Sequence, residues 1–469
     1  MTVTDQSGRL ETDMGPDDEP PLRRTIGLPQ MALYSLGSML GAGIYGLIGK
    51  AAGEMGSAVW LAFLVAMVAA LLTGLSYASL GSRYPRAGGA AYVTQKAYGM
   101  PLLTYLVGLA VMCSGITSVA TQSRVVATTL QRSDLLAAAP TTLLALGFLL
   151  LLAGIVFRGI KECMWLNVIC TLVEAGGLLV IIAVGASYWG SVSLMELPPA
   201  EDGSPGVLSA TLLLQGAVLT FFSFIGFEDS MNVAEEVKNP RRTLPWGIVI
   251  AMVAATFIYL AVSVTAVSVV PWQELKEAAG PLVEVANRAA PWIPPAVFVV
   301  ITLFAVGNTA LLNYVMASRL VYGMSRQGLL PRALGHVHPG RRTPHMAILA
   351  LLALVVALML AGDITALASA TVILLLFVFT IVNVALVVLK RRPEEPRGGF
   401  EVPIFVPVLG AAVCLALLGN RVLTGDATAT MLAGVMLAGI VALYAAMRPK
   451  RIIDVPVRED TGEEAVRAG

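Results

Sequence analysis

The chain alternates between long apolar runs and short polar connections. An apolar run of about 20 residues is long enough to cross a bilayer as a helix. The pattern predicts twelve spans, at about residues 29–49, 57–81, 97–123, 141–157, 163–187, 208–233, 244–270, 294–322, 345–361, 364–389, 403–421 and 428–446. Because the connections are short, the spans form one all-α helical bundle in the membrane. The polar ends, residues 1–24 and 448–469, are expected to be disordered cytoplasmic tails.

The first span contains a break in its apolar pattern. Gly41, Ala42 and Gly43 lie near the middle of the run from Leu28 to Ile48. Glycine costs about 1 kcal/mol inside a helix relative to alanine and allows the backbone to leave helical angles. Inside a membrane, a broken helix is tolerated only where protein or a polar cavity satisfies the freed backbone groups. The alternative is a close contact between helices through small residues.

A second break lies in the sixth span, where Phe224, Ile225 and Gly226 precede the acidic residue Glu228. Spans one and six are the first helices of two five-helix halves, and an odd number of helices gives the halves opposite orientations. Paired broken helices in inverted halves point to a transporter's binding site at the membrane midplane. We therefore expect a core over residues 25–395, with repeats at about 25–190 and 205–395. Residues 396–447 supply two peripheral helices.

Composition supports this class of protein. Hydrophobic residues make up 57% of the chain and charged residues 13%, whereas a soluble domain has about 25% charged residues. The lipid bilayer is therefore an expected partner. The sequence contains no basic patch with interleaved aromatic residues, so nucleic acid is not an expected partner. It also contains no nucleophile–base pair, phosphate loop or metal-ligand spacing, so we expect no enzymatic activity, cofactor or metal site. If the N-terminus is cytoplasmic, Lys and Arg gather in the inner loops, which predicts a plasma-membrane or inner-membrane protein with both termini in the cytoplasm.

Four motifs occur in an order that is similar to one known family. They are GSMLGAGIY at 37–45, SLGSRYPRAGGA at 79–90, IGFE at 225–228 with AEEVKNP at 234–240, and SR at 318–319 with GLLP at 328–331. In these motifs the chain resembles the amino acid–polyamine–organocation superfamily, in particular its bacterial amino acid permeases. The resemblance implies the leucine-transporter fold, with five plus five inverted helices, and alternating access to an amino acid site.

The resemblance also implies roles for the residues at the two breaks. The backbone around Gly41, Ala42 and Gly43 would hold the substrate carboxylate. Carbonyl groups around Phe224, Ile225 and Gly226 would receive the substrate ammonium group. One of the aromatic residues Phe222, Phe224 and Phe227 would act as an outer gate, and Phe222 and Phe227 are the two predicted gate residues. The alternative for each aromatic residue is plain helix packing.

Two further acids lie at membrane depth. Many proton-coupled relatives have a lysine in span five where this chain has Glu174. Since acids inside a membrane are functional candidates by default, Glu174 is predicted to couple proton movement to the first helix. The alternative is a carboxyl group that only forms a hydrogen bond between helices. Glu228 is predicted to cap free N–H groups at the second break, with proton coupling or substrate contact as the alternative.

Two more acids lie at the end of the sixth span. Glu235 and Glu236 stand close in sequence to Lys238, Arg241 and Arg242. They are predicted to form an inner gate or a surface salt-bridge network.

The function predicted from these features is secondary active transport of an amino acid, with proton-coupled uptake by alternating access. A proton is favoured over sodium as the coupling ion. A neutral or apolar substrate side chain is favoured, because apart from Glu174 and Glu228 the core offers no obvious charged partner for a cationic or dicarboxylic side chain. An uncoupled exchanger of amino acids or polyamines on the same fold is the first alternative, and a channel is the second. The substrate's identity and the oligomeric state are left open.

Overall fold

The computed structural model describes residues 22, 24–131, 138–199, 206–278, 280–361, 364–424 and 427–447. The two predicted tails therefore lie almost wholly outside the described residues. The helices are α1 (Leu28–Met39), α2 (Ala42–Met55), η1 (Gly56–Ala58), α3 (Val59–Arg83), α4 (Gly89–Tyr98), α5 (Pro101–Gln131), α6 (Thr141–Arg158), α7 (Ile160–Gly185), η2 (Ala186–Tyr188), α8 (Ala210–Phe221), η3 (Phe222–Phe224), η4 (Phe227–Glu236), α9 (Pro240–Val269), α10 (Trp272–Glu277), α11 (Pro281–Ala289), α12 (Pro295–Arg326), η5 (Arg332–Gly335), α13 (His345–Ala361), α14 (Ile364–Lys390), α15 (Phe405–Thr424) and α16 (Ala427–Met447).

The helices account for the spans predicted from the apolar pattern. Within the described ranges, nine stretches are long and apolar enough to cross a membrane. Two shorter apolar helices, at 345–360 and 433–447, add to these nine. The broken pair α1 and α2 supplies the remaining span, so the observed helices match the twelve predicted runs.

The two broken spans run antiparallel to each other. α2, the second half of span one, packs against α8, the first half of span six. α1 packs against η4, which is the second half of span six. This arrangement brings the two breaks to the same level of the bundle, as the inverted halves predict.

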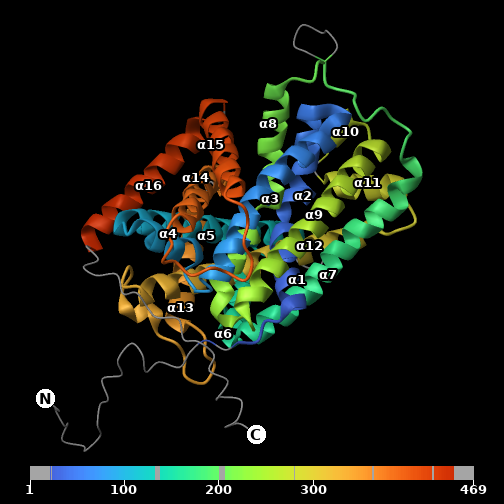
Figure 1. Ribbon diagram of the computed structural model, residues 1–469. Helices are drawn as coiled ribbons and strands as arrows, with labels where there is room; N and C mark the ends of the chain where they lie inside the picture. Colours follow the sequence, from blue (N-terminus) through green and yellow to red (C-terminus); the bar gives the residue numbers. More distant parts are fainter. Residues whose placement is uncertain are drawn as a thin grey trace, which may run out of the picture.

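Long helices surround the two broken spans. α12 packs against α5 and α7, while α9 packs against α1 and α3. α14, α15 and α16 lie together on one flank, on the side away from α2, α10 and α11 (Figure 1). The broken spans are thus enclosed by continuous helices that can hold them in place.

Local sequence explains where the sixth span ends and the seventh begins. Asn239 adopts left-handed backbone angles, with φ of 47°, which the short side chain of asparagine tolerates. Pro240 follows as the first residue of α9, a position where its missing N–H group leaves no hydrogen bond unmade. The chain therefore turns sharply between η4 and α9.

An ion-pair clamp joins the end of α3 to the connection between α14 and α15. Glu401 accepts two hydrogen bonds of 2.7 Å from Arg83 and a third from Lys390. Partial burial acts to raise the pKa of Glu401, but these bonds and one from the N–H of Gly398 outweigh it and lower the pKa to about 2. The carboxylate therefore stays ionised at neutral pH, and the clamp ties α15 to the core.

Candidate functional site

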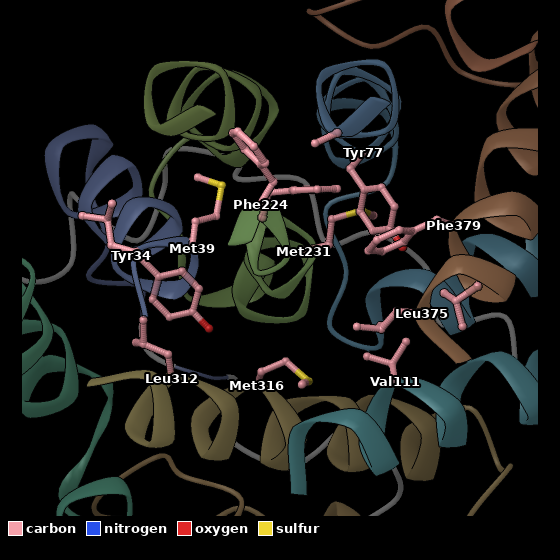
Figure 2. Packing of buried hydrophobic residues seen from close by; sticks show 14 of the residues in the cluster. Tyr34, Met39, Tyr77, Val111, Phe224, Met231, Leu312, Met316, Leu375 and Phe379 are labelled. Atoms are coloured by element: carbon pink, nitrogen blue, oxygen red, sulfur yellow. The ribbon is translucent and has the colours of Figure 1, made fainter. Parts of the chain in front are cut away.

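A cavity lies where the two broken spans meet. Its volume is about 70 Å³, and since a single water needs roughly 10–15 Å³ of such space, the cavity holds several water-sized groups. Figure 2 shows four residues of its wall among the buried hydrophobic side chains, namely Met39 of α1, Val111 of α5, Met316 of α12 and Leu375 of α14. The described residues that line it are Ser38, Met39, Gly41, Gly43, Val111, Ser114, Ser118, Gln122, Phe222, Ile225, Gly226, Glu228, Asp229, Thr309, Asn313, Met316 and Leu375.

The first break requires glycine because the chain passes close to two other elements. A Cβ atom at Gly41 would collide with the hydroxyl of Thr309 on α12. A Cβ atom at Gly43 would lie 2.7 Å from the Cα atom of Ser223. α2 begins at Ala42, and in the part of the chain that the structure describes no side chain caps the helix at Gly41. The first N–H groups of α2 have no partner within the helix, and Gly41 and Gly43 line the cavity.

The second break is held by a local cap. Gly226 has φ of +130°, which L side chains rarely adopt, and a Cβ atom there would lie 2.6 Å from the carbonyl carbon and oxygen of Ser38. The N–H group of Gly226 donates to Oε2 of Glu228 over 2.8 Å. Glu228 thus accepts a hydrogen bond from a backbone donor that the break exposes. Its predicted structural or coupling role stays a prediction.

The acid after Glu228 also lies in the cavity wall. Asp229 is 3% exposed, and its Oδ2 atom accepts a hydrogen bond of 2.7 Å from the hydroxyl of Ser38. The sequence interpretation did not single out this residue. Its place directly after the predicted break and its acidic side chain were the available signals.

The predicted aromatic and carbonyl residues fall into two groups. Phe222, Ile225 and Gly226 line the cavity. Phe224 is buried against Tyr259, with ring centroids 5.0 Å apart. Phe227 packs with Phe379, with centroids 5.5 Å apart, and neither Phe224 nor Phe227 is among the described lining residues. The gate roles of Phe222 and Phe227 stay predictions.

Glu174 lies behind the first broken span and not in the cavity wall. It is fully buried, and neither oxygen of its carboxyl group has a hydrogen-bond partner among the described residues. The Asn308 side chain approaches it from α12 but donates its N–H to the Thr171 hydroxyl over 3.1 Å. Tyr45 of α2 donates its hydroxyl to the backbone carbonyl of Glu174 over 3.1 Å.

The polar side chains of Asn167, Thr171 and Asn308, which together with Glu174 form a polar cluster, lie close to α1. A Cβ atom at Gly37 would collide with the hydroxyl of Thr171 and would lie 2.6 Å from Nδ2 of Asn308. Oδ1 of Asn167 would be 2.9 Å away. The Glu174 region therefore contacts both halves of the first span, α1 through Gly37 and α2 through Tyr45.

A buried ion pair joins the end of η4 to α12. Glu236 and Arg319 have fully buried side chains, and Arg319 donates from Nε over 3.0 Å and from a terminal nitrogen over 3.2 Å. The carbonyl of Glu236 accepts the N–H groups of Thr25 and Ile26, just before α1. The sequence placed Glu236 beside Lys238, Arg241 and Arg242. The structure pairs it with Arg319 instead.

Comparison with known proteins agrees with this architecture. A sequence model of the family described as Amino acid permease matches residues 26–443. The chain is 30% identical to the methylthioribose transporter of Bacillus subtilis (strain 168), with 87% of this chain and 90% of the relative aligned. It is also 30% identical to the branched-chain amino acid permease BcaP of the same strain, with 86% of this chain and 89% of the relative aligned. Identity to cationic amino acid transporter 4 of Mus musculus is 31%, over 81% of this chain and 61% of the relative.

This chain belongs to the amino acid permease family. The resemblance drawn from the four motifs is thereby confirmed, and so is the all-helical membrane fold of about twelve spans with two broken helices. The residue boundaries predicted for the two repeats stay predictions.

One residue of this permease ties the two breaks together and was not found from the sequence. The hydroxyl of Tyr259, on α9, lies 2.6 Å from the carbonyl oxygen of Met39 and 2.8 Å from that of Ser223. Its single proton is shared between the end of α1 and η3. A tyrosine within an apolar span was the only signal that the sequence offered.

We expect Tyr259→Phe to lower the stability of the permease by about 1–3 kcal/mol, because it leaves buried carbonyl groups without a donor. Thermal unfolding of the purified protein in detergent measures this change. Tyr77→Phe is the matched control, since the Tyr77 hydroxyl is buried with no hydrogen-bond partner among the described residues. Equal melting temperatures for the wild type and Tyr259→Phe would contradict the role of the hydroxyl as a tie.

Proposed function

We propose that this permease is a secondary active transporter that carries an amino acid into the cell together with protons, by alternating access. The observation that carries the proposal is the meeting of two antiparallel broken spans at one cavity. Discontinuous helices of this kind offer unpaired N–H groups to an anionic group and free carbonyls to a cation. An amino acid carries both of these charges.

The two breaks suit the two ends of an amino acid backbone. The substrate carboxylate would lie at the start of α2, at Gly41, Ala42 and Gly43, where helix N–H groups and the helix dipole favour an anion. The ammonium group would lie towards the carbonyls near Ile225 and Gly226. The names of two relatives, a branched-chain amino acid permease and a cationic amino acid transporter, support amino acids as substrates.

Glu174 is the proposed coupling group. The neighbouring side chains of Asn167, Thr171 and Asn308 are neutral and do not titrate, whereas the carboxyl group of Glu174 can take up and release a proton. The cluster contacts α1 at Gly37, so a change in charge there acts on the first broken helix. The positions of Lys and Arg support placement in the plasma or inner membrane with cytoplasmic termini.

We expect Glu174→Gln to abolish accumulation driven by an inward proton gradient, with at least a tenfold loss, while substrate binding survives. Glutamine keeps the size and polarity of the side chain but carries no titratable proton. The measurement is uptake of a radiolabelled amino acid panel into proteoliposomes. Glu162→Gln is the matched control, because Glu162 lies on the same helix, α7, and is exposed.

Two outcomes would contradict this assignment. Equal accumulation by wild type and Glu174→Gln would make Glu174 a structural residue. Uptake that requires substrate inside the vesicles, with or without a proton gradient, would replace the proton-coupled transporter by an exchanger.

A further inference from the structure

The cavity wall contains a carboxylate that the capping of the second break does not use. Glu228 directs Oε2 at the N–H group of Gly226, so its role is at least partly structural. Asp229 also lines the cavity and is 3% exposed. Among the described residues, the hydroxyl of Ser38 is the one side-chain donor to its carboxylate.

Among the residues that the structure describes, no cationic side chain balances Asp229 in the cavity wall. The described residues that line the cavity include no lysine, arginine or histidine. The buried guanidinium of Arg319 is already paired with Glu236 at the end of η4. Removing a carboxylate from water is costly unless a positive partner and hydrogen bonds compensate for it. One neutral hydroxyl supplies only part of that compensation.

The cavity can obtain the missing positive charge from its ligand. We propose that Asp229 forms an ion pair with the ammonium group of the substrate and thereby makes a positively charged nitrogen the main requirement for binding. This inference rests on the proposed function of the cavity as the amino acid site. It adds the carboxylate of Asp229 to the backbone carbonyls that the breaks offer to the ammonium group.

An ion pair changes what the site selects. Hydrogen bonds to charged groups are roughly twice as strong as those between neutral groups. A ligand that keeps the ammonium group but lacks the carboxylate should therefore retain much of its affinity. A ligand that keeps the carboxylate but lacks the ammonium group should bind poorly, because it leaves Asp229 unpaired.

The test measures thermal stabilisation and affinity of the purified permease in lipid nanodiscs. The probes are the twenty common L-amino acids, followed by the amine and the acid that match each stabilising amino acid. For leucine, these are 3-methylbutylamine and 4-methylpentanoate. We expect the amine to stabilise the wild type and the acid to have no effect. This comparison uses the wild type alone and needs no variant to fold.

Variants then assign the effect to Asp229. Asp229→Asn keeps the size of the side chain and an acceptor for Ser38 but removes the charge, and we expect a 10- to 100-fold loss of affinity for the amino acid and its amine. Ser38→Ala is the matched control, since it removes the hydrogen bond to Asp229 but keeps the charge, and we expect a smaller loss. Melting temperatures without probe show that each variant is folded.

Three results would overturn the inference. If the wild type and Asp229→Asn bind amino acids equally, Asp229 is not the ammonium partner, although the permease remains an amino acid binder. If Na⁺ alone, and not choline, stabilises the wild type but not Asp229→Asn, the carboxylate binds an alkali cation instead. If none of the amino acids stabilises the wild type, the proposed function fails together with this inference.

Discussion

We expect Gly226→Ala to abolish transport and to lower the free energy of unfolding by about 2–6 kcal/mol. A residue with a side chain in this left-handed region costs about 1–3 kcal/mol in backbone strain. The added Cβ atom also meets the carbonyl group of Ser38 at 2.6 Å, and overpacking of a tight interior costs about 1–3 kcal/mol more. Thermal unfolding in detergent and uptake into proteoliposomes measure the two effects.

Gly176→Ala is the matched control for this prediction. Gly176 lies within α7, and a Cβ atom there would meet no atom within 4 Å. Because alanine favours a helix over glycine by about 1 kcal/mol, this variant should be as stable as the wild type or slightly more stable. Wild-type transport by Gly226→Ala would show that the second break does not depend on glycine.

We expect Glu236→Gln to destabilise the permease by about 3–5 kcal/mol. The change leaves the guanidinium of Arg319 buried without its counter-ion, and breaking a buried pair from one side is far more costly than the pair's net contribution. Chemical or thermal unfolding in detergent measures the loss. A double variant that replaces both Glu236 and Arg319 by leucine should recover part of it, because no unpaired charge remains.

A surface ion pair provides the comparison for this effect. Glu274 accepts a hydrogen bond from Arg288, and their side chains are 55% and 38% exposed. Glu274→Gln should change stability by less than about 1 kcal/mol, since water replaces the partner. If Glu236→Gln and Glu274→Gln lower the stability equally, burial of the ion pair between Glu236 and Arg319 does not explain the effect of Glu236→Gln.

The residues of the cavity wall that the sequence singles out are those marked by local chain chemistry. Gly41, Gly43 and Gly226 stand out because glycine is a poor helix residue inside an apolar run. The capping geometry of Glu228 could be anticipated because its partner, Gly226, is two residues away. Local signals of this kind do not depend on how the helices pack.

The features that sequence interpretation missed depend on contacts between distant helices. Asp229 bonds to Ser38, 191 residues away. Tyr259 joins carbonyl groups on two other spans. Glu236 has basic neighbours in sequence, but its partner is Arg319, 83 residues further along the chain. In each case the partner is selected by the antiparallel packing of the spans, which apolar periodicity does not encode.

The form of η4 has a consequence for the length of the sixth span. All ten residues from Phe227 to Glu236 adopt 3₁₀ geometry, although such runs rarely exceed three or four residues. A 3₁₀ helix rises about 2.0 Å per residue and an α-helix about 1.5 Å. Rewinding this segment as an α-helix would therefore shorten it by about 5 Å. Val237, which follows η4, is held to Ile26 by a parallel bridge. Such a change of helical pitch would therefore move the cavity end of η4 towards Val237 along the helix axis, without any hinge.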